Sequence, residues 1–206
     1  MPVLRQDTGR VEQKRRTRES LMSAAVRLLR EGRTPTVATA ADRAGVSRAT
    51  AYRYFPTQEA LLVPAQVHAG ESPVSDEQLL DTQEVTDPAA RAALVARRIG
   101  EYSFDNEQLL RTALRLSLDP ALDYERPGHR RRWIARLMEP LPVGPDQRTL
   151  RRLAGALNLA MGIEAVVALT DIAGLDRDEA LDVLAWTAES LVRTAAESAA
   201  EDPYQI

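Results

Sequence analysis

Apolar residues recur at helical spacing along most of the chain. Leu21, Ala25, Leu28 and Leu29 lie at positions i, i+4, i+7 and i+8, so they form one stripe on a helix expected over 11–31. Alternating runs of β-branched residues, which are typical of strands, are missing, whereas Ala, Leu, Arg and Glu are abundant. The pattern therefore predicts an all-α fold.

Turn and cap residues follow one another closely in the first 64 residues and predict four helices there. Gly32 suits the end of the first helix, because glycine accepts the left-handed conformation of a helix C-cap. Caps for the next three helices are offered, in order, by Thr34 or Thr36, by Ser47 and by Thr57. Pro64 should kink or end the fourth helix, since proline has no backbone N–H.

Longer helices are expected in the rest of the chain. Proline, serine and acidic residues gather between 70 and 86 and indicate a loop. After this loop, helices are expected over 88–103, 105–118, 128–139, 146–172 and 176–199. We therefore predict an N-terminal domain over 1–62 and a larger helical domain over 63–206.

Composition narrows the kinds of site that the chain can hold. The sequence has no cysteine and two histidines far apart, which excludes disulfides and thiolate metal sites, and we expect no metal and no cofactor. No apolar stretch approaches the roughly 18 residues of a membrane span, and the N-terminus does not resemble a signal peptide. These features predict a cytoplasmic protein with no membrane contact.

Charge is distributed unevenly between the two parts of the chain. Residues 1–64 hold 12 Lys and Arg against 6 Asp and Glu, whereas the remainder holds 15 against 24. A basic end can bind a polyanion while an acidic body stays away from it. The basic segment from Arg5 to Arg18 is either an arm that contacts DNA or a disordered tail.

Residues 36–62 have the spacing of a helix-turn-helix. Ala41 is small enough for two helices to touch there, and Gly45 tolerates a positive φ in the turn. If Val46, Ala51 and Phe55 face inward, the opposite face of the third helix presents Arg48, Ala49, Tyr52 and Arg53. Such a face can enter a DNA major groove, where arginine binds guanine in a fork. The alternative is a tightly packed three-helix unit with a solvated basic face.

The same segment resembles the signature of the TetR (tetracycline-repressor) family of regulators. The resemblance rests on the run GVSRATAYRYFPTQEALL and, with the preceding helices, extends over about 50 of the 206 residues. It implies that Arg48, Ala49 and Tyr52 face base edges. It further implies contacts to the DNA backbone from the side chains of Thr36, Ser47, Thr50 and Tyr54. Gln58 stands where the family commonly has lysine, so a phosphate contact at this helix start is either lost or reduced to a neutral hydrogen bond. Ala40 and Ala51 replace larger aliphatic residues, so this small core is either looser or closed by Met22 and Leu61.

The resemblance also implies a homodimer in which the last two long helices of each subunit pair. Their apolar stripes agree with this, and we predict interface residues Leu157, Met161, Leu184 and Leu191, although one chain's own core could use the same stripes. A pocket for a small-molecule effector is expected among polar and aromatic groups, at Tyr102, Phe104, Arg111, Arg115, Trp133 and Asn158. Arg130, Arg131 and Arg132, after His129, form either a solvated helix start or a site for an anionic effector. Glu164 lines the pocket or pairs with an arginine across the dimer.

The function predicted from these features is that of a DNA-binding transcription regulator. The family default is a repressor, which a small-molecule effector releases from a palindromic double-stranded operator; an activator would differ only in where the operator lies. The alternative is a helical small-molecule-binding protein or enzyme with no role on DNA. We see no nucleophile, base and orienting group at a recognisable spacing and no glycine-rich phosphate loop, and we expect no catalytic residues.

Overall fold

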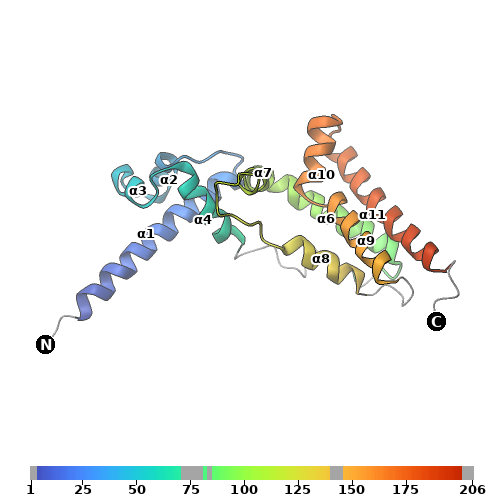
Figure 1. Ribbon diagram of the computed structural model, residues 1–206. Helices are drawn as coiled ribbons and strands as arrows, with labels where there is room; N and C mark the ends of the chain where they lie inside the picture. Colours follow the sequence, from blue (N-terminus) through green and yellow to red (C-terminus); the bar gives the residue numbers. More distant parts are fainter. Residues whose placement is uncertain (1–3, 71–80, 83–84, 140–145, 201–206) are drawn as a thin grey trace. The chain divides into compact units, whose positions relative to one another are not determined.

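The computed structural model describes residues 4–70, 81–82, 85–139 and 146–200, and every regular element in these ranges is a helix (Figure 1). The all-α fold is therefore confirmed. The chain divides into two compact units. Met1–Pro73 and Asn106–Pro127 belong to the first, and Val74–Asp105 and Gly128–Ile206 belong to the second. The division into domains at residue 62 stays a prediction. The two compact units are not the same as the predicted domains, because residues 106–127 belong to the first unit.

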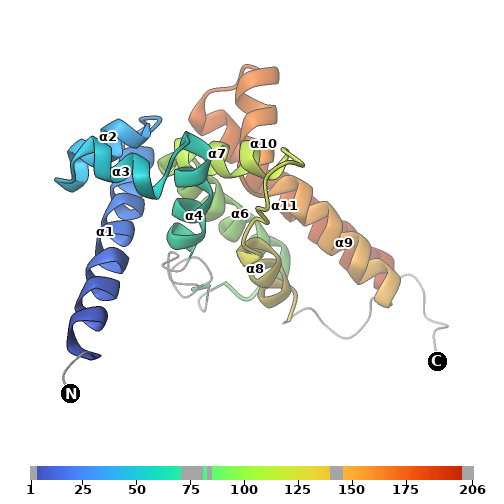
Figure 2. The same ribbon diagram turned by 60° about the vertical axis from the view of Figure 1, so that its left-hand side comes forward.

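The first unit is built on a long first helix. Its helices are α1 (Leu4–Arg30), α2 (Val37–Ala44), α3 (Arg48–Tyr54), α4 (Gln58–Gly70) and α7 (Glu107–Ser117). Figure 2 shows α2, α3 and α4 gathered at the C-terminal half of α1. Their buried side chains form one core, made of Leu21, Met22, Ala25, Val26, Val37, Ala40, Ala41, Ala51, Phe55, Leu61 and Ala65. A second cluster joins α7 to α1 and α4 through Leu29, Leu62, Leu109, Ala113, Leu116 and Tyr124.

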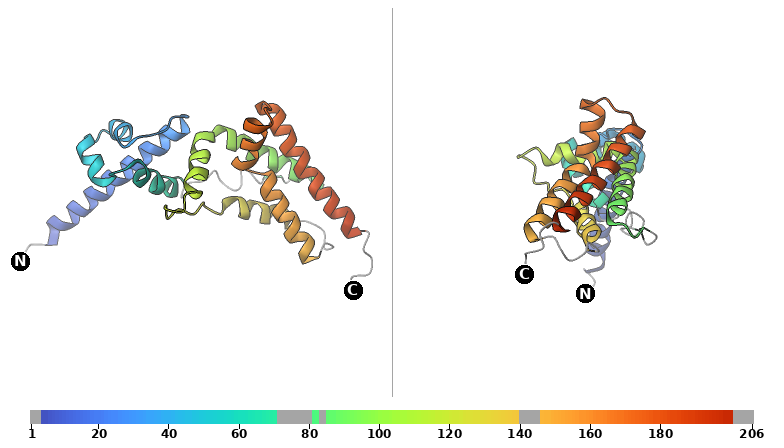
Figure 3. Two further views of the ribbon diagram at one scale, coloured as in Figure 1. Left: turned by 45° about the horizontal axis from the view of Figure 1, so that its top comes forward. Right: turned by 90° about the vertical axis from the view of Figure 1, so that its right-hand side faces the viewer.

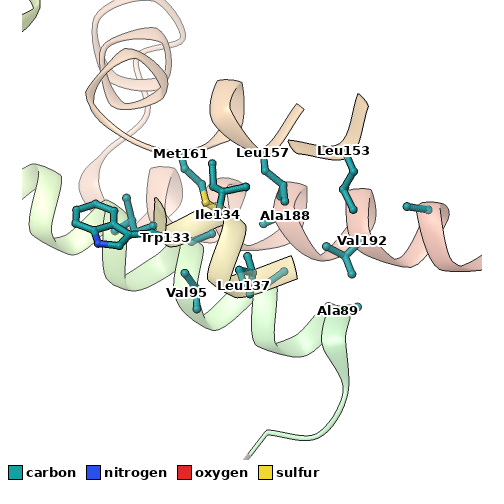
Figure 4. Packing of buried hydrophobic residues seen from close by; sticks show 14 residues of the cluster. Ala89, Val95, Trp133, Ile134, Leu137, Leu153, Leu157, Met161, Ala188 and Val192 are labelled. Atoms are coloured by element: carbon teal, nitrogen blue, oxygen red, sulfur yellow. The ribbon is translucent and has the colours of Figure 1, made fainter. Parts of the chain in front are cut away.

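The second unit packs long helices against one another. Its helices are α6 (Pro88–Asp105), α8 (His129–Met138), α9 (Gln147–Ala160), α10 (Ile163–Val167) and α11 (Arg177–Ala200), with a π-helical turn η1 (Ala168–Ile172) before α11. In Figure 3, α11 runs along both α6 and α9. Figure 4 shows the core of this unit, where apolar side chains from α6, α8, α9 and α11 point toward one another.

The single helix expected over 146–172 is wrong, because the chain breaks after α9. Gly162 has a φ of 102°, a conformation that residues with a side chain rarely adopt. The guanidinium of Arg130 fills the space where a Cβ would stand at Gly162. Arg130 donates to the Met161 carbonyl and to both carboxylate oxygens of Glu164, at 2.7 and 3.0 Å. The apolar period continues across the break, so spacing alone does not reveal it.

Pro64 does not end the fourth helix, which was one of the two outcomes expected for this proline. α4 continues through Pro64 to Gly70. Leu62 and Ala65 on either side of the proline are fully buried, and the Gln66 side chain donates to the Leu109 carbonyl at 3.0 Å. These contacts compensate for the backbone hydrogen bond that proline cannot make.

The N-terminal helix also begins earlier than predicted, at Leu4 instead of residue 11. Ion pairs one turn apart support its exposed first half: Arg15 contacts Glu12 at 2.7 Å and Glu19 at 2.8 Å. The basic segment is therefore helical from Leu4 onward. The expected loop at 70–86 lies largely outside the described residues.

None of the described helices is by itself long and apolar enough to cross a bilayer. Together, the segments Gln147–Ala160 and Ile163–Ile172 have the length and apolar composition of a membrane span, but they are bent by 53° at the break between them.

Candidate nucleic-acid interface

The turn between α2 and α3 has the geometry that the spacing predicts. Gly45 is left-handed, with a φ of 68°, and the Val46 N–H donates to the Ala41 carbonyl at 3.0 Å. Ala41 is fully buried in the core shared with α1. A small residue at the helix contact and a glycine in the turn thus bring α3 back against α2.

Hydroxyl side chains cap both helices of this pair. At α2, the Thr36 hydroxyl accepts from the Thr39 N–H at 3.1 Å, and the Thr39 hydroxyl accepts from the Thr36 N–H at 2.8 Å. At α3, the Ser47 hydroxyl accepts from the Thr50 N–H at 3.2 Å and donates to the Thr50 hydroxyl at 2.9 Å. Thr36 and Ser47 are the predicted caps, and these hydrogen bonds fix where each helix begins.

The two faces of α3 differ sharply in exposure. Ala51 and Phe55 are buried in the core of the first unit. On the other face, the Tyr52 side chain is 48% exposed, and the remaining exposed residues are Arg48, Ala49 and Arg53. The predicted division into an inner and an outer face is therefore correct for these residues, while Val46 is half-buried against the same core.

Arg48 is held by an acidic partner that the sequence analysis did not single out. Its Nε donates to Oδ1 of Asp42 at 3.2 Å, and its Nη2 donates to Oδ2 at 2.8 Å. The Arg48 guanidinium lowers the pKa of Asp42 through hydrogen bonding and charge, and Asp42 raises the pKa of Arg48 in turn. Opposite charges six residues apart, on either side of a glycine turn, are the signal that could have predicted this pair.

The last two predicted DNA-contacting residues of α3 lie beside each other. The Arg53 guanidinium lies 5.9 Å from the ring centroid of Tyr54, a distance at which a cation is attracted to an aromatic face. Tyr54 is half-buried and packs on the core, and Thr50 is half-buried at the start of the helix. Both residues thus keep a partly exposed surface.

The three departures from the family pattern have local consequences. The Gln58 side chain donates to the Pro35 carbonyl at 3.0 Å, so it ties the start of α4 to the segment before α2. Ala40 and Ala51 are fully buried, and Met22 and Leu61 share their cluster. The larger residues on α1 and α4 therefore close the small core, which is the second of the two alternatives.

Residues 21–64 match the family model described as "Bacterial regulatory proteins, tetR family". This segment includes the turn, both caps and the exposed face of α3. These residues carry the DNA-binding domain of the TetR family. The chain is accordingly a DNA-binding transcription regulator. No curated protein and no solved structure matches the chain at a significant level.

In this regulator, the predicted effector residues are divided between the two units. Arg111 and Arg115 lie on α7 in the first unit, where Arg111 pairs with Glu107 at 2.7 Å. The other four lie in the second unit, at Tyr102, Phe104, Trp133 and Asn158. The structure therefore does not gather all six residues within one unit.

Two of the predicted effector residues do meet in an aromatic cluster. The rings of Tyr102 and Trp133 pack edge to face, with centroids 6.4 Å apart, and His129 stacks on Trp133 at 6.2 Å. The Nε2 atom of His129 is buried and has no hydrogen-bond partner among the described residues. Phe104 instead lies under the Arg177 guanidinium, at 5.3 Å from the ring centroid. The Asn158 amide donates to the Ala154 carbonyl within α9.

The arginine run after His129 is mainly solvated. Arg131 and Arg132 are exposed, whereas Arg130 is partly buried and forms the ion pair with Glu164. The arginine partner of Glu164 is therefore in its own chain, and Arg130 has a structural role at the break after α9.

Most of the predicted dimer residues serve the chain's own core. Leu157, Met161 and Leu184 are almost completely buried, and the partly buried Leu191 packs against the cluster that contains Leu157 and Met161. A side chain that its own chain already covers has little surface to offer a partner. The interface role of these residues stays a prediction. Leu159 on α9 and Trp186 on α11 are instead 80% and 68% exposed. The sequence analysis did not single them out, because periodicity alone cannot tell which apolar stripe of a helix the chain's own core will bury.

Proposed function

We propose that this regulator is a repressor that binds a palindromic operator as a homodimer and leaves it when a small-molecule effector binds. The single observation that carries the DNA part is the exposed face of α3, where Arg48, Tyr52 and Arg53 surround Ala49 opposite a buried face. Folding of this unit does not require such a face, but insertion into a major groove does.

Contacts to the DNA backbone would come from the ends of the helices. Thr36 and Ser47 are exposed at the first turns of α2 and α3, where backbone N–H groups favour a phosphate. Thr50 and Tyr54 add hydroxyl groups nearby. These contacts fix the register of α3 on the duplex, and its side chains then distinguish bases.

Dimerisation would use the exposed apolar residues of the last long helices. Leu159 and Trp186 are large and mostly exposed on helices that otherwise pack within their unit. Burying such residues against a second copy removes apolar surface from water. Two α3 helices would then bind half-sites about 34–36 Å apart, which is why we expect a palindromic operator.

The effector site is proposed at the aromatic cluster of the second unit. Trp133 and Tyr102 offer aromatic surface, and the buried His129 Nε2 is a polar group that a ligand could satisfy. The mechanism is a shift of population. The effector binds more tightly to a state in which the spacing of the two α3 helices does not match adjacent grooves, so the operator is released.

The test is the affinity of the purified full chain for its own promoter region, measured by fluorescence anisotropy beside random DNA. We expect nanomolar, salt-sensitive binding that Arg48→Ala and Tyr52→Ala each weaken strongly. Binding no tighter than to random DNA, also after unfolding and refolding to remove bound ligand, would contradict the proposal. For the effector, equal operator affinity with and without a saturating compound that binds the second unit would contradict release.

A further inference from the structure

Arg48 carries its charge on the most exposed face of α3, yet it is not free to rotate at random. The Asp42 carboxylate accepts from Nε and Nη2, so it binds the side edge of the guanidinium. Arginine has five N–H donors in a planar fork. Pairing at the side edge uses two of them and leaves the end edge, formed by Nη1 and the second hydrogen of Nη2.

The end edge of a guanidinium matches guanine. In the major groove guanine presents two acceptors, O6 and N7, and a bidentate arginine is their commonest partner. We infer that Asp42 is a positioning residue that holds Arg48 side-on so that its end edge binds a guanine of the operator. This inference rests on the proposed binding of the α3 face to DNA, and it adds the base that is recognised and the residue that orients its partner.

The positions of the two charges support a role beyond helix stability. Asp42 lies in the last turn of α2, and Arg48 is the first residue of α3. A carboxylate near a helix C-terminus and a cation at an N-terminus are each disfavoured by the helix dipole. Both side chains are also more than half exposed, at 55% and 66%, where an ion pair stabilises the fold little. A pair that gains so little for the fold is better explained by the orientation it gives to Arg48.

The backbone around the pair is well fixed. Asp42 lies in α2 just before the left-handed Gly45, and Arg48 lies in α3 directly after the Ser47 cap. The backbone of both residues is therefore held in a helix. An orienting residue must itself be held, because a mobile carboxylate could not restrict the guanidinium.

The experiment selects binding sites for the full chain from a library of DNA duplexes with a randomised centre. Wild type, Asp42→Asn, Arg48→Ala and the control Glu31→Gln are compared. Glu31 pairs with Arg43, not with Arg48, in the same unit, and its variant loses the same negative charge. Affinities are then measured for the selected site and for versions in which each guanine is replaced in turn by another base or by 7-deazaguanine, which lacks N7.

We expect one guanine in each half-site to be preferred by wild type about tenfold or more over other bases. Arg48→Ala and Asp42→Asn should both lose most of this preference, whereas Glu31→Gln should keep it. Removing a negative charge can tighten binding to all DNA, so the ratio between bases is the informative quantity. Equal thermal melting of Asp42→Asn and Glu31→Gln would show that folding does not explain the difference, and Asp42→Ala repeats the test without an amide.

Each contrary outcome identifies what fails. If Asp42→Asn keeps the guanine preference while Arg48→Ala loses it, Asp42 does not orient Arg48 and the inference is overturned, although the proposed function stands. If Arg48→Ala also keeps the preference, Arg48 does not bind the guanine and the inference is overturned. If wild type selects no sequence at all, the proposed function fails and the inference fails with it.

Discussion

Tyr124 is a buried residue whose hydroxyl group has no hydrogen-bond partner among the described residues. It belongs to the apolar cluster that joins α7 to α1 and α4. An unsatisfied buried hydroxyl costs about 1–3 kcal/mol, so Tyr124→Phe should be at least as stable as wild type. Urea denaturation measures this, and a loss of more than about 1 kcal/mol would show that the hydroxyl has a partner after all.

The same residue predicts a dependence on alkaline pH. Burial raises the pKa of the Tyr124 phenol above its ordinary value, and the charge of Arg126 opposes this only in part. The folded protein therefore holds this proton to a higher pH than the unfolded chain does. Its contribution to stability is complete below the ordinary pKa of about 10 and is lost as the pH rises past it. Tyr124→Phe should show a smaller alkaline loss of stability than wild type.

Gly162 and Gly155 form a matched pair of glycines on either side of the end of α9. Gly162 has a positive φ and the Arg130 guanidinium against it, so Gly162→Ala should lower the free energy of unfolding by roughly 1–3 kcal/mol. Gly155 lies inside α9 with open space around it, so Gly155→Ala should raise stability by roughly 0.5–1 kcal/mol. Chemical denaturation of both variants tests this, and a destabilised Gly155→Ala or a neutral Gly162→Ala would be inconsistent with the break.

At the scale of elements, sequence signals fix the first unit much better than the second. The Ser47 cap and the Gly45 turn are local, so the sequence predicts where α3 begins, and it narrows the start of α2 to Thr34 or Thr36. The break at Gly162 depends on Arg130, which is 32 positions away in the chain, and no local pattern encodes it. The Asp42–Arg48 pair lies between these cases, because its charges are near in sequence but only the turn brings them together.

The cap of α9 provides a prediction for one helix. The Asp146 carboxylate accepts from the Thr149 N–H at 2.6 Å, and hydrogen bonds from Thr149 lower the pKa of Asp146. A carboxylate with a lowered pKa stabilises the fold above its ordinary pKa, and this contribution disappears as the pH falls through the lowered value. Asp146→Ala should therefore lower the melting temperature by a few degrees at neutral pH and by less in acid. An equal loss at both pH values would mean that the charged cap does not matter.

At the scale of the whole molecule, subunit pairing is the feature that the exposed residues allow us to test. Trp186→Glu and Leu159→Glu place a charge where the proposed interface would bury apolar surface, so each should shift a dimer toward monomer in sedimentation velocity. Leu118→Glu is the control, because Leu118 is equally apolar and 73% exposed but lies after α7 in the first unit. Dimerisation that survives both substitutions would place the interface elsewhere.

Operator recognition by two copies of α3 is the central claim, and methylation interference at guanine N7 tests it most directly. Methyl groups at N7 stand in the major groove, where the Arg48 and Tyr52 face would lie. On the selected operator we predict two clusters of interfering guanines, centred about 10 base pairs or a multiple of this apart, and their loss in Arg48→Ala. A specific complex in which no guanine N7 interferes would contradict major-groove recognition by α3.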